Sequence, residues 1–242
     1  MDGLSNAFSV LEIEAENDQV DISFSKAIPV STNSTGSTSQ VNGSLVEKKK
    51  QCEHMSSTLY KMPLVWIDLE MTGLNVEVDR ILEIACIITD GNLTKSVEGP
   101  DLVVHQTKDC LEKMGEWCQS HHAASGLTEK VVGSTLSERQ AENQVIEFVK
   151  RHVGTYTPLL AGNSVYMDFL FLKKYMPDLA SLFSHQLVDV SSLTALCIRW
   201  YPRDHKRSPR KENQHRALAD IRESIEELRY YKENIFKAKS KK

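Results

Sequence analysis

The chain has 242 residues and a formal net charge of −4, and 40% of its residues are hydrophobic. These values are typical of a soluble globular protein, with room for one large domain or one domain and a tail. No apolar run reaches the roughly 18 residues that a transmembrane helix needs. The five cysteines are odd in number and lack CxxC spacing, which argues against a disulfide framework or structural zinc site and favours a reducing compartment.

The first 57 residues differ in composition from the rest. They contain the polar run STNSTGSTSQVNGS followed by EKKK, which offers little apolar surface to bury, so we interpret residues 1–57 as a disordered polar tail. The more apolar FSVLEIEAENDQVDISF is an alternative candidate for a short interaction strand or helix. The segment is acidic and no arginine precedes Arg80, unlike a mitochondrial transit peptide. The cytoplasm is therefore the expected compartment, with the mitochondrion as the alternative.

Three strands are predicted where the folded part begins. LVWIDLEM alternates apolar residues with Trp66, Asp68 and Glu70, as a strand does. RILEIACIITDGN predicts a second strand that ends in the turn signal Asp90-Gly91, which favours a hairpin. PDLVVHQ would be the third strand of an antiparallel meander.

Helices and strands then alternate along the chain. SERQAENQVIEFVKRHV predicts an amphipathic helix, TPLLAGNS a short buried strand, and VYMDFLFLKKYMP a helix that Pro177 closes. HQLVDVSSLTALCIRWYP predicts a strand and then a helix with Ser191 or Ser192 as its N-cap. These elements predict one mixed α/β sheet, a three-strand antiparallel meander plus parallel strands, with helices on both faces.

HRALADIRESIEELRYYKENIF predicts the last long helix. Its apolar residues recur at steps of three and four, which predicts one buried stripe. The stripe consists of Leu218, Ile221, Ile225 and Leu228.

Four acidic residues form a candidate site. Asp68 and Glu70 are two positions apart on the first strand, so their side chains share one face. Asp168 follows a short strand near the start of a helix, and Asp220 lies on the last helix. Carboxylates this close raise one another's pKa, but hard divalent cations such as Mg²⁺ or Mn²⁺ prefer oxygen ligands and would stabilise the group. Two such ions about 4 Å apart clamp the attacking and leaving oxygens of a phosphoryl displacement.

His215 is the candidate general base for this chemistry. A neutral imidazole with a pKa near the physiological range can deprotonate an attacking water. His215 precedes Asp220 by five residues, and five positions in an ideal helix rotate by roughly 140°. The two side chains would not stack, so we expect His215 in the loop or first turn, reaching into the site from above.

Several segments together resemble the oligoribonucleases, of the DEDD exonuclease superfamily in its histidine-containing branch. They include WIDLEMTGL, DRILEIA, GNSVYMD, DVSSL and HRALADIRESIEELRYY. A lone D-x-E is common on strands, but the ordered set D-x-E, D, H-x4-D is specific. The resemblance runs from about Leu64 to Phe236, so residues 58–236 would be the exonuclease domain and residues 237–242 a basic C-terminal tail.

The resemblance implies a ribonuclease-H-like fold, a homodimer, two Mg²⁺ or Mn²⁺ ions, and 3′-to-5′ degradation of very short single-stranded RNA to mononucleotides. It also implies roles for the candidate residues. The metal ligands would be Asp68, Glu70, Asp168 and Asp220, and the general base would be His215.

Five further positions match residues that bind substrate in this family. Leu74 would wedge against the bases, and Trp117 and His122 would line the pocket of the 3′ nucleotide. The hydroxyls of Ser164 and Ser191 would hold the 5′ phosphate. A site closed at both ends measures the length of its substrate, which would explain a preference for dinucleotides.

The sequence departs from the family in one place. Members carry Tyr-Arg before DVSS, where this chain has His185 and Gln186. In the family the tyrosine reaches the partner subunit's site and the arginine holds the 5′ phosphate. Gln186 cannot make a charged bidentate contact, whereas His185 could stack and partly compensate. A weaker length preference is therefore expected.

Two other functions remain alternatives. A DNA-directed exonuclease would use the same metal site, but GNS and the context of Leu74 favour the oligoribonucleases. A non-catalytic RNA-binding protein would not need the complete acidic set with His215. The mildly acidic chain also suits a very short substrate, because long nucleic acids usually require a basic face.

Overall fold

A single five-stranded sheet organises the part of the chain that the computed structural model describes, residues 60–210 and 216–236. The predicted tails at residues 1–57 and 237–242 lie outside these ranges and stay predictions. The strands are β1 (Leu64–Met71), β2 (Ile81–Thr89), β3 (Ser96–Val103), β4 (Leu159–Gly162) and β5 (Leu187–Asp189).

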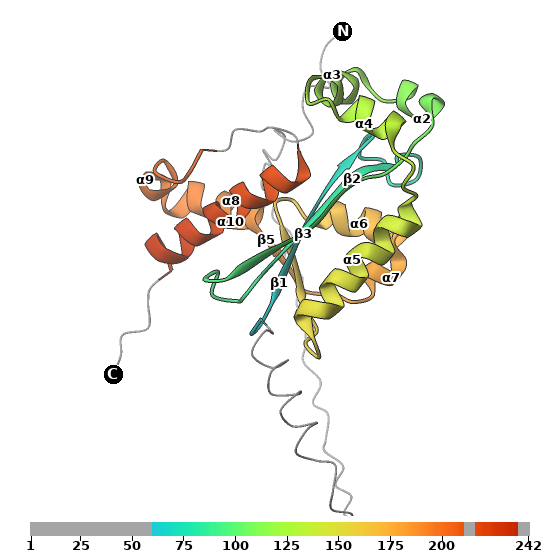
Figure 1. Cartoon of the computed structure of the whole chain (residues 1–242). Helices are drawn as coiled ribbons and strands as arrows, with labels where there is room; N and C mark the ends of the chain where they lie inside the picture. The colour runs from blue at the N-terminus through green and yellow to red at the C-terminus, as the bar shows by residue number, and fades with distance from the viewer. Residues whose placement is uncertain (1–59, 211–215, 237–242) are drawn as a thin grey trace, which may run out of the picture. The chain divides into compact units, whose positions relative to one another are not determined.

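The strand order is β3-β2-β1-β4-β5 (Figure 1). β1, β2 and β3 pair antiparallel, while β1, β4 and β5 run parallel. The predicted meander with added parallel strands is therefore confirmed. Because these three strands are parallel, the C-terminal ends of β1, β4 and β5 lie on the same side of the sheet.

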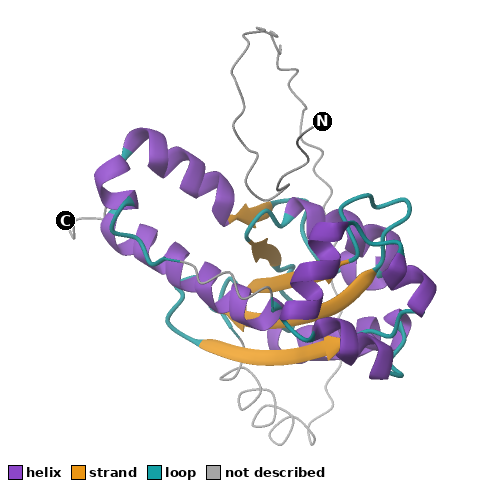
Figure 2. Cartoon of the chain, turned by 90° about the horizontal axis from the view of Figure 1, so that it is seen from above, coloured by secondary structure: helices purple, strands orange, loops and turns teal. Residues whose placement is uncertain are grey.

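Helices cover both faces of the sheet, as predicted (Figures 1 and 2). One face packs against α5 (Glu138–Val153), α6 (Tyr166–Tyr175) and α7 (Pro177–Ala180). The other packs against α8 (Val190–Trp200) and α10 (Ala217–Asn234), with the short α9 (Pro202–His205) after α8. None of the described helices is long and apolar enough to cross a bilayer.

The alternation along β1 decides which side chains meet which helices. Val65, Ile67 and Leu69 enter the core under α5 and α6, whereas Trp66 enters the core under α8 and α10. Side chains two apart on a strand share a face, so Asp68 and Glu70 continue the Trp66 face toward the end of the strand. The carboxylates thereby point to the side of the sheet that α10 covers.

Three short helices lie together near the end of β1, in a region for which the sequence predicted no element (Figure 1). They are α2 (Lys108–Glu112), α3 (Glu116–Ala124) and α4 (Leu127–Gly133). They enclose a small core of Leu111, Met114, Leu127 and Val131 against Leu82 of β2. Each helix is too short to show a clear 3.6-residue repeat, so contacts with the sheet decide their structure.

Two details of the predicted elements are wrong. The third strand begins at Ser96 and ends at Val103, earlier than PDLVVHQ. The ladder between β2 and β3 is irregular between Ala85 and Ile87, and an irregular edge strand tolerates a glycine and a proline such as Gly99 and Pro100. The N-cap of α8 is Asp189, whose side chain accepts a hydrogen bond from the Ser191 amide, instead of either serine.

Candidate active site

Carboxylates from β1 and α10 come together at the C-terminal end of β1. One oxygen each of Asp68, Glu70 and Asp220 lie within 4.8 Å of one another, a grouping able to hold a metal ion. Asp168 stands in the first turn of α6, and its Oδ1 accepts a hydrogen bond of 2.9 Å from the Leu69 amide. This bond fixes the fourth acid beside the strand that carries the first two.

A buried ion pair ties α10 to the sheet next to this cluster. Glu83 is fully buried on β2, directly across from Glu70 in the strand register. Its carboxylate accepts hydrogen bonds from Arg216 Nη2 at 2.6 Å and from the Ala217 amide at 3.2 Å. The pair anchors the start of α10, which places Asp220, one turn later, over β1.

Burial and mutual repulsion make the acids hard to ionise in the absence of a cation. Burial raises the pKa of Glu70 to about 8, with further increases from Asp220, Glu83 and Asp168, while Arg216 opposes the shift. Burial also raises the pKa of Asp168 to about 8, against the hydrogen bond from Leu69. The pKa of Asp68 lies well above its usual range for the same reason, burial first and the neighbouring carboxylates second.

The arrangement fits a divalent metal ion. The clustered carboxylates offer oxygen ligands, which suit hard cations, and carboxylates that disfavour their own ionisation gain most from a nearby positive charge. Asp68, Glu70, Asp168 and Asp220 are the residues that would hold the metal.

These pKa shifts predict a distinct pH dependence of stability. The pKa of Glu70 is about 8 in the folded protein, above its usual 4.5. The stabilisation from protonated Glu70 is therefore fully present below about pH 4.5. That stability is lost as the pH rises toward about 8. The melting temperature of chelator-treated protein should therefore fall between pH 5 and pH 8, and divalent cations should raise it more at pH 8.

The matched control for this prediction is Glu70→Gln, which cannot ionise and should show a smaller fall. A chelated wild type whose melting temperature changes with pH no more than that of Glu70→Gln would contradict the assignment.

The structure brings His122 to the cluster. It is buried on α3, its Nε2 donates to the Met71 carbonyl at 2.9 Å, and its Nδ1 lies 3.9 Å from Glu70 Oε2. Trp117 lies five residues earlier on α3 and stacks on His121 with ring centroids 3.9 Å apart. Both predicted pocket residues therefore stand on one helix, at the end of β1.

The two predicted phosphate hydroxyls also lie together. Ser164 Oγ donates to Ser191 Oγ at 3.3 Å, and Ser191 Oγ donates to Asp189 Oδ1 at 2.6 Å. The same Asp189 oxygen accepts from the Ser164 amide at 3.0 Å. Ser164 has a φ of 54°, an uncommon conformation for a residue other than glycine. Asp189 was missed by the sequence analysis, although DVS is a recognisable capping pattern.

His185 and Gln186 do not join the other predicted residues within one chain. Both are exposed and immediately precede β5, whereas Ser191 follows it. β5 runs parallel to β4, and β4 to β1. His185 and Gln186 therefore lie where these strands begin, whereas the carboxylates lie where β1 ends. His215 falls outside the described residues and directly precedes Arg216 in the sequence.

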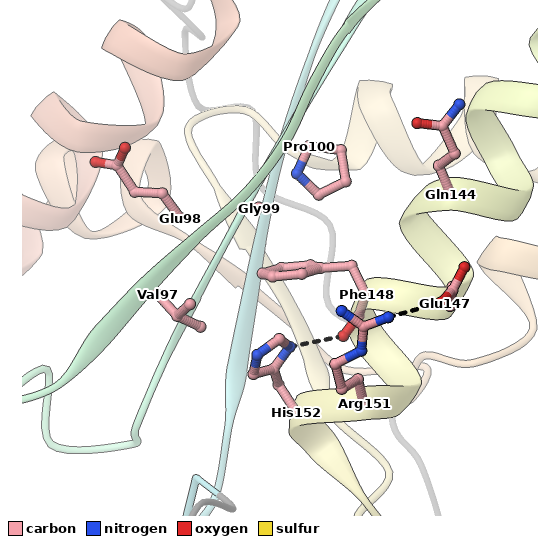
Figure 3. A pocket seen from close by; sticks show the side chains of 9 residues that line it. All are labelled: Val97, Glu98, Gly99, Pro100, Gln144, Glu147, Phe148, Arg151 and His152. Carbon is pink, nitrogen blue, oxygen red and sulfur yellow. Dashed lines mark hydrogen bonds and ion pairs between the residues drawn. The ribbon is translucent and has the colours of Figure 1, made fainter.

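A groove of about 480 Å³ lies between residues 97–100 of β3 and residues 144–152 of α5 (Figure 3). The Phe148 ring packs on Gly99, where an added Cβ would come within 2.3 Å of it. None of the clustered carboxylates lines this groove. The groove is therefore separate from the carboxylate cluster.

Comparison with known proteins agrees with this geometry. The sequence model of the exonuclease family RNase_T matches residues 65–228. Over 240 residues the chain is 63% identical to an oligoribonuclease of Arabidopsis thaliana, which covers 99% of this chain and 100% of that protein. The chain belongs to the oligoribonuclease family.

A second relative and a solved structure complete the comparison. The mitochondrial oligoribonuclease of Bos taurus is 47% identical over 177 residues, 73% of this chain and 75% of that protein. Exonuclease I of E. coli, in a zinc-bound complex with single-stranded DNA, superposes with a TM-score of 0.56 at 16% identity. That alignment covers 72% of this chain and 41% of the exonuclease I chain. At this identity it shows the fold alone and confirms the ribonuclease-H-like fold of this oligoribonuclease family member.

Proposed function

We propose that this chain degrades very short single-stranded RNA to 5′-mononucleotides with two Mg²⁺ or Mn²⁺ ions held by Asp68, Glu70, Asp168 and Asp220. Its family makes the chain a 3′-to-5′ exoribonuclease, a hydrolase of phosphodiester bonds. The observation that carries the proposal is the convergence of Asp68, Glu70 and Asp220 within 4.8 Å at the end of the central strand.

The residues of the chain divide the work of hydrolysis. Bound divalent cations would supply the positive charge that stabilises a developing phosphorane and would acidify the attacking water. His215 accepts the proton from that water as general base. Asp168, fixed by the Leu69 amide, keeps the acidic set oriented, and Arg216 balances the buried charge of Glu83.

The substrate is held at both of its ends. Trp117 and His122 line the pocket of the 3′ nucleotide, and Leu74 packs between the bases. The Ser164 and Ser191 hydroxyls donate to the 5′ phosphate, for which they must turn away from their present partners, Ser191 Oγ and Asp189. Enclosure at both ends favours RNA of two nucleotides over longer RNA.

Product analysis tests this function. Purified protein is incubated with 5′-phosphorylated RNAs of two to seven nucleotides, and with DNA of the same sequences, in Mg²⁺, in Mn²⁺ and in chelator. We expect mononucleotides released from the 3′ end, the dinucleotide consumed fastest, and no cleavage in chelator. Equal or faster cleavage of DNA would support the DNA-directed alternative, and binding without cleavage in either metal would support the non-catalytic one.

We also propose that the enzyme works as a homodimer. Large apolar side chains are exposed at the end of α8, where Trp200 is 66% and Ile198 48% exposed, and a patch of this kind marks an interaction surface. His185 and Gln186 lie where the parallel strands begin, and the carboxylates of the same chain lie where β1 ends. The two residues would therefore contribute to the active site of a second copy of the chain and not to that of their own. Trp200→Glu should then convert dimer to monomer in light scattering.

The Gln186 position gives a prediction about substrate affinity. A charged donor to phosphate is worth about 1.5–3 kcal/mol, so Gln186→Arg should tighten binding of the 5′-phosphorylated dinucleotide by roughly tenfold or more. The unphosphorylated dinucleotide should bind almost unchanged. The Kd values of both ligands, measured with Ca²⁺ to slow cleavage, check this. Equal effects on the two ligands would show that residue 186 does not face the phosphate.

The cytoplasm stays our proposed compartment, on the acidic composition of residues 1–57. One relative carries the name of a mitochondrial oligoribonuclease, so a fluorescent fusion of the full chain is the appropriate test.

A further inference from the structure

One carboxylate organises the loop that connects β1 to β2. Asp79 accepts a hydrogen bond from Thr72 Oγ1 at its Oδ1, 2.8 Å, and from the Asn75 amide at its Oδ2, 2.8 Å. Its own amide donates to the Asn75 carbonyl at 2.8 Å. A single side chain near the end of the loop therefore holds both a buried threonine at its start and the backbone at its middle.

The surrounding residues leave little freedom in this arrangement. The Thr72 hydroxyl accepts from the Arg80 amide at 3.0 Å while it donates to Asp79, and the Thr72 amide donates to the Arg80 carbonyl at 3.0 Å. At Gly73 an added Cβ would lie 2.5 Å from Asp79 Oδ2. The carboxylate thus fills the space beside Gly73, and a larger residue there would displace it from its present position.

Leu74 lies in the sequence between the two residues that hydrogen-bond to the Asp79 carboxylate, Thr72 and Asn75. It is partly buried against the core that α5 and α6 share with the sheet, and it follows Glu70 of the carboxylate cluster by four residues. The same carboxylate therefore binds the side chain of Thr72 before Leu74 and the backbone amide of Asn75 directly after it.

We infer that Asp79 is a positioning residue for substrate: it holds Leu74 where two adjacent bases must pass, and so controls how tightly a pair of bases is accepted. This inference rests on the proposed function, in which Leu74 packs between the bases. Asp79 affects base recognition through Leu74, whereas the rate of phosphodiester hydrolysis depends on the carboxylates.

The contacts on the outer side of the loop provide the matched control. Lys174 of α6 lies 2.7 Å from Glu77, whose side chain is 81% exposed. An exposed ion pair of this kind contributes little. Lys174→Ala removes a contact to the same loop without touching the Asp79 network.

The experiment compares two substrates that differ by one base: a 5′-phosphorylated RNA dinucleotide, and the same dinucleotide with an abasic 5′ residue. We expect the wild type to prefer the first through a lower KM. In Asp79→Asn and Thr72→Val, which each lose hydrogen bonds of the network, the KM for the complete dinucleotide should rise by roughly tenfold. The KM for the abasic substrate and the kcat for both should stay within about twofold of the wild-type values.

Conservative and coupled variants separate positioning from a general loss of structure. Thr72→Ser keeps the hydroxyl and should retain the wild-type preference, as should Lys174→Ala. Leu74→Ala should abolish the preference by itself, and adding Asp79→Asn to it should change little more, because the two residues act as a unit.

The outcomes distinguish this inference from the function on which it rests. If Leu74→Ala loses the preference and Asp79→Asn keeps it, Asp79 does not position Leu74 and the inference is overturned alone. A fall in kcat on both substrates in Asp79→Asn would also overturn it. If the wild type hydrolyses neither substrate in Mg²⁺ or Mn²⁺, the proposed function fails.

Discussion

Replacing Asp68 or Asp220 with alanine should abolish RNA cleavage while the protein stays folded. The two carboxylates and Glu70 contribute oxygens that lie within 4.8 Å of one another, so the loss of either would remove a proposed metal ligand. Removing one acid also relieves some of the repulsion among the carboxylates that remain. The metal-free variants should therefore melt at or above the temperature of the metal-free wild type.

Cleavage of a 5′-phosphorylated dinucleotide, with circular dichroism and thermal melting of the same samples, checks this prediction. The matched control is Asp109→Ala, which removes an exposed acid at the start of α2 and should change neither property. Loss of helical signal from wild-type protein in chelator would show instead that the metal is needed for folding.

His215→Ala should lower kcat by roughly 10²-fold or more, the usual contribution of a positioned general base, with little change in KM. His215 directly precedes Arg216, whose guanidinium is held 2.6 Å from buried Glu83, so the chain enters α10 from a fixed point beside the carboxylates. The wild-type rate should fall below about pH 6.5, where an ordinary imidazole becomes protonated.

The control for this prediction is His152→Ala on α5, whose ring contacts the Phe148 carbonyl of its own helix. An undiminished rate in His215→Ala would remove His215 from the mechanism. A wild-type rate independent of pH between 5 and 8 would show that no imidazole limits it.

The features of the site that could be predicted are those set by local geometry. The two-residue spacing of Asp68 and Glu70 on an alternating strand is enough to place both carboxylates on one face. The resemblance to the oligoribonucleases, which rests on the ordered acidic set, then implies that Asp168 and Asp220 join them. The structure confirms that Asp220 lies within 4.8 Å of the pair, while the assignment of all four as metal ligands stays a prediction.

Long-range contacts explain what the sequence did not provide. Glu83 interrupts the apolar segment ILEIACII and was left out of the site, yet it is the acid that anchors α10 through Arg216. Nothing local indicates that pairing, because 133 positions separate the two residues. The same reason applies to α2, α3 and α4, whose small core forms only against Leu82 of β2.

The N-cap of α8 shows how neighbouring candidates compete. Ser191 and Ser192 are good capping residues, but Asp189 accepts from the Ser191 amide and also from the Ser164 amide of the preceding crossover. The Asp189 carboxylate accepts hydrogen bonds from two backbone segments, whereas a serine hydroxyl at the N-cap would accept from one. Ser191 is thereby left beside Ser164, where the phosphate of the substrate is proposed to bind.

The most direct test of the account is the number of Mn²⁺ ions bound per chain, measured by electron paramagnetic resonance in the presence of a mononucleotide product. The proposed function predicts two ions in the wild type, and fewer, with weaker binding, in Asp68→Ala and Asp220→Ala. Wild-type protein that binds no Mn²⁺, or binding that is unchanged in both variants, would contradict the assignment of these residues as the metal centre.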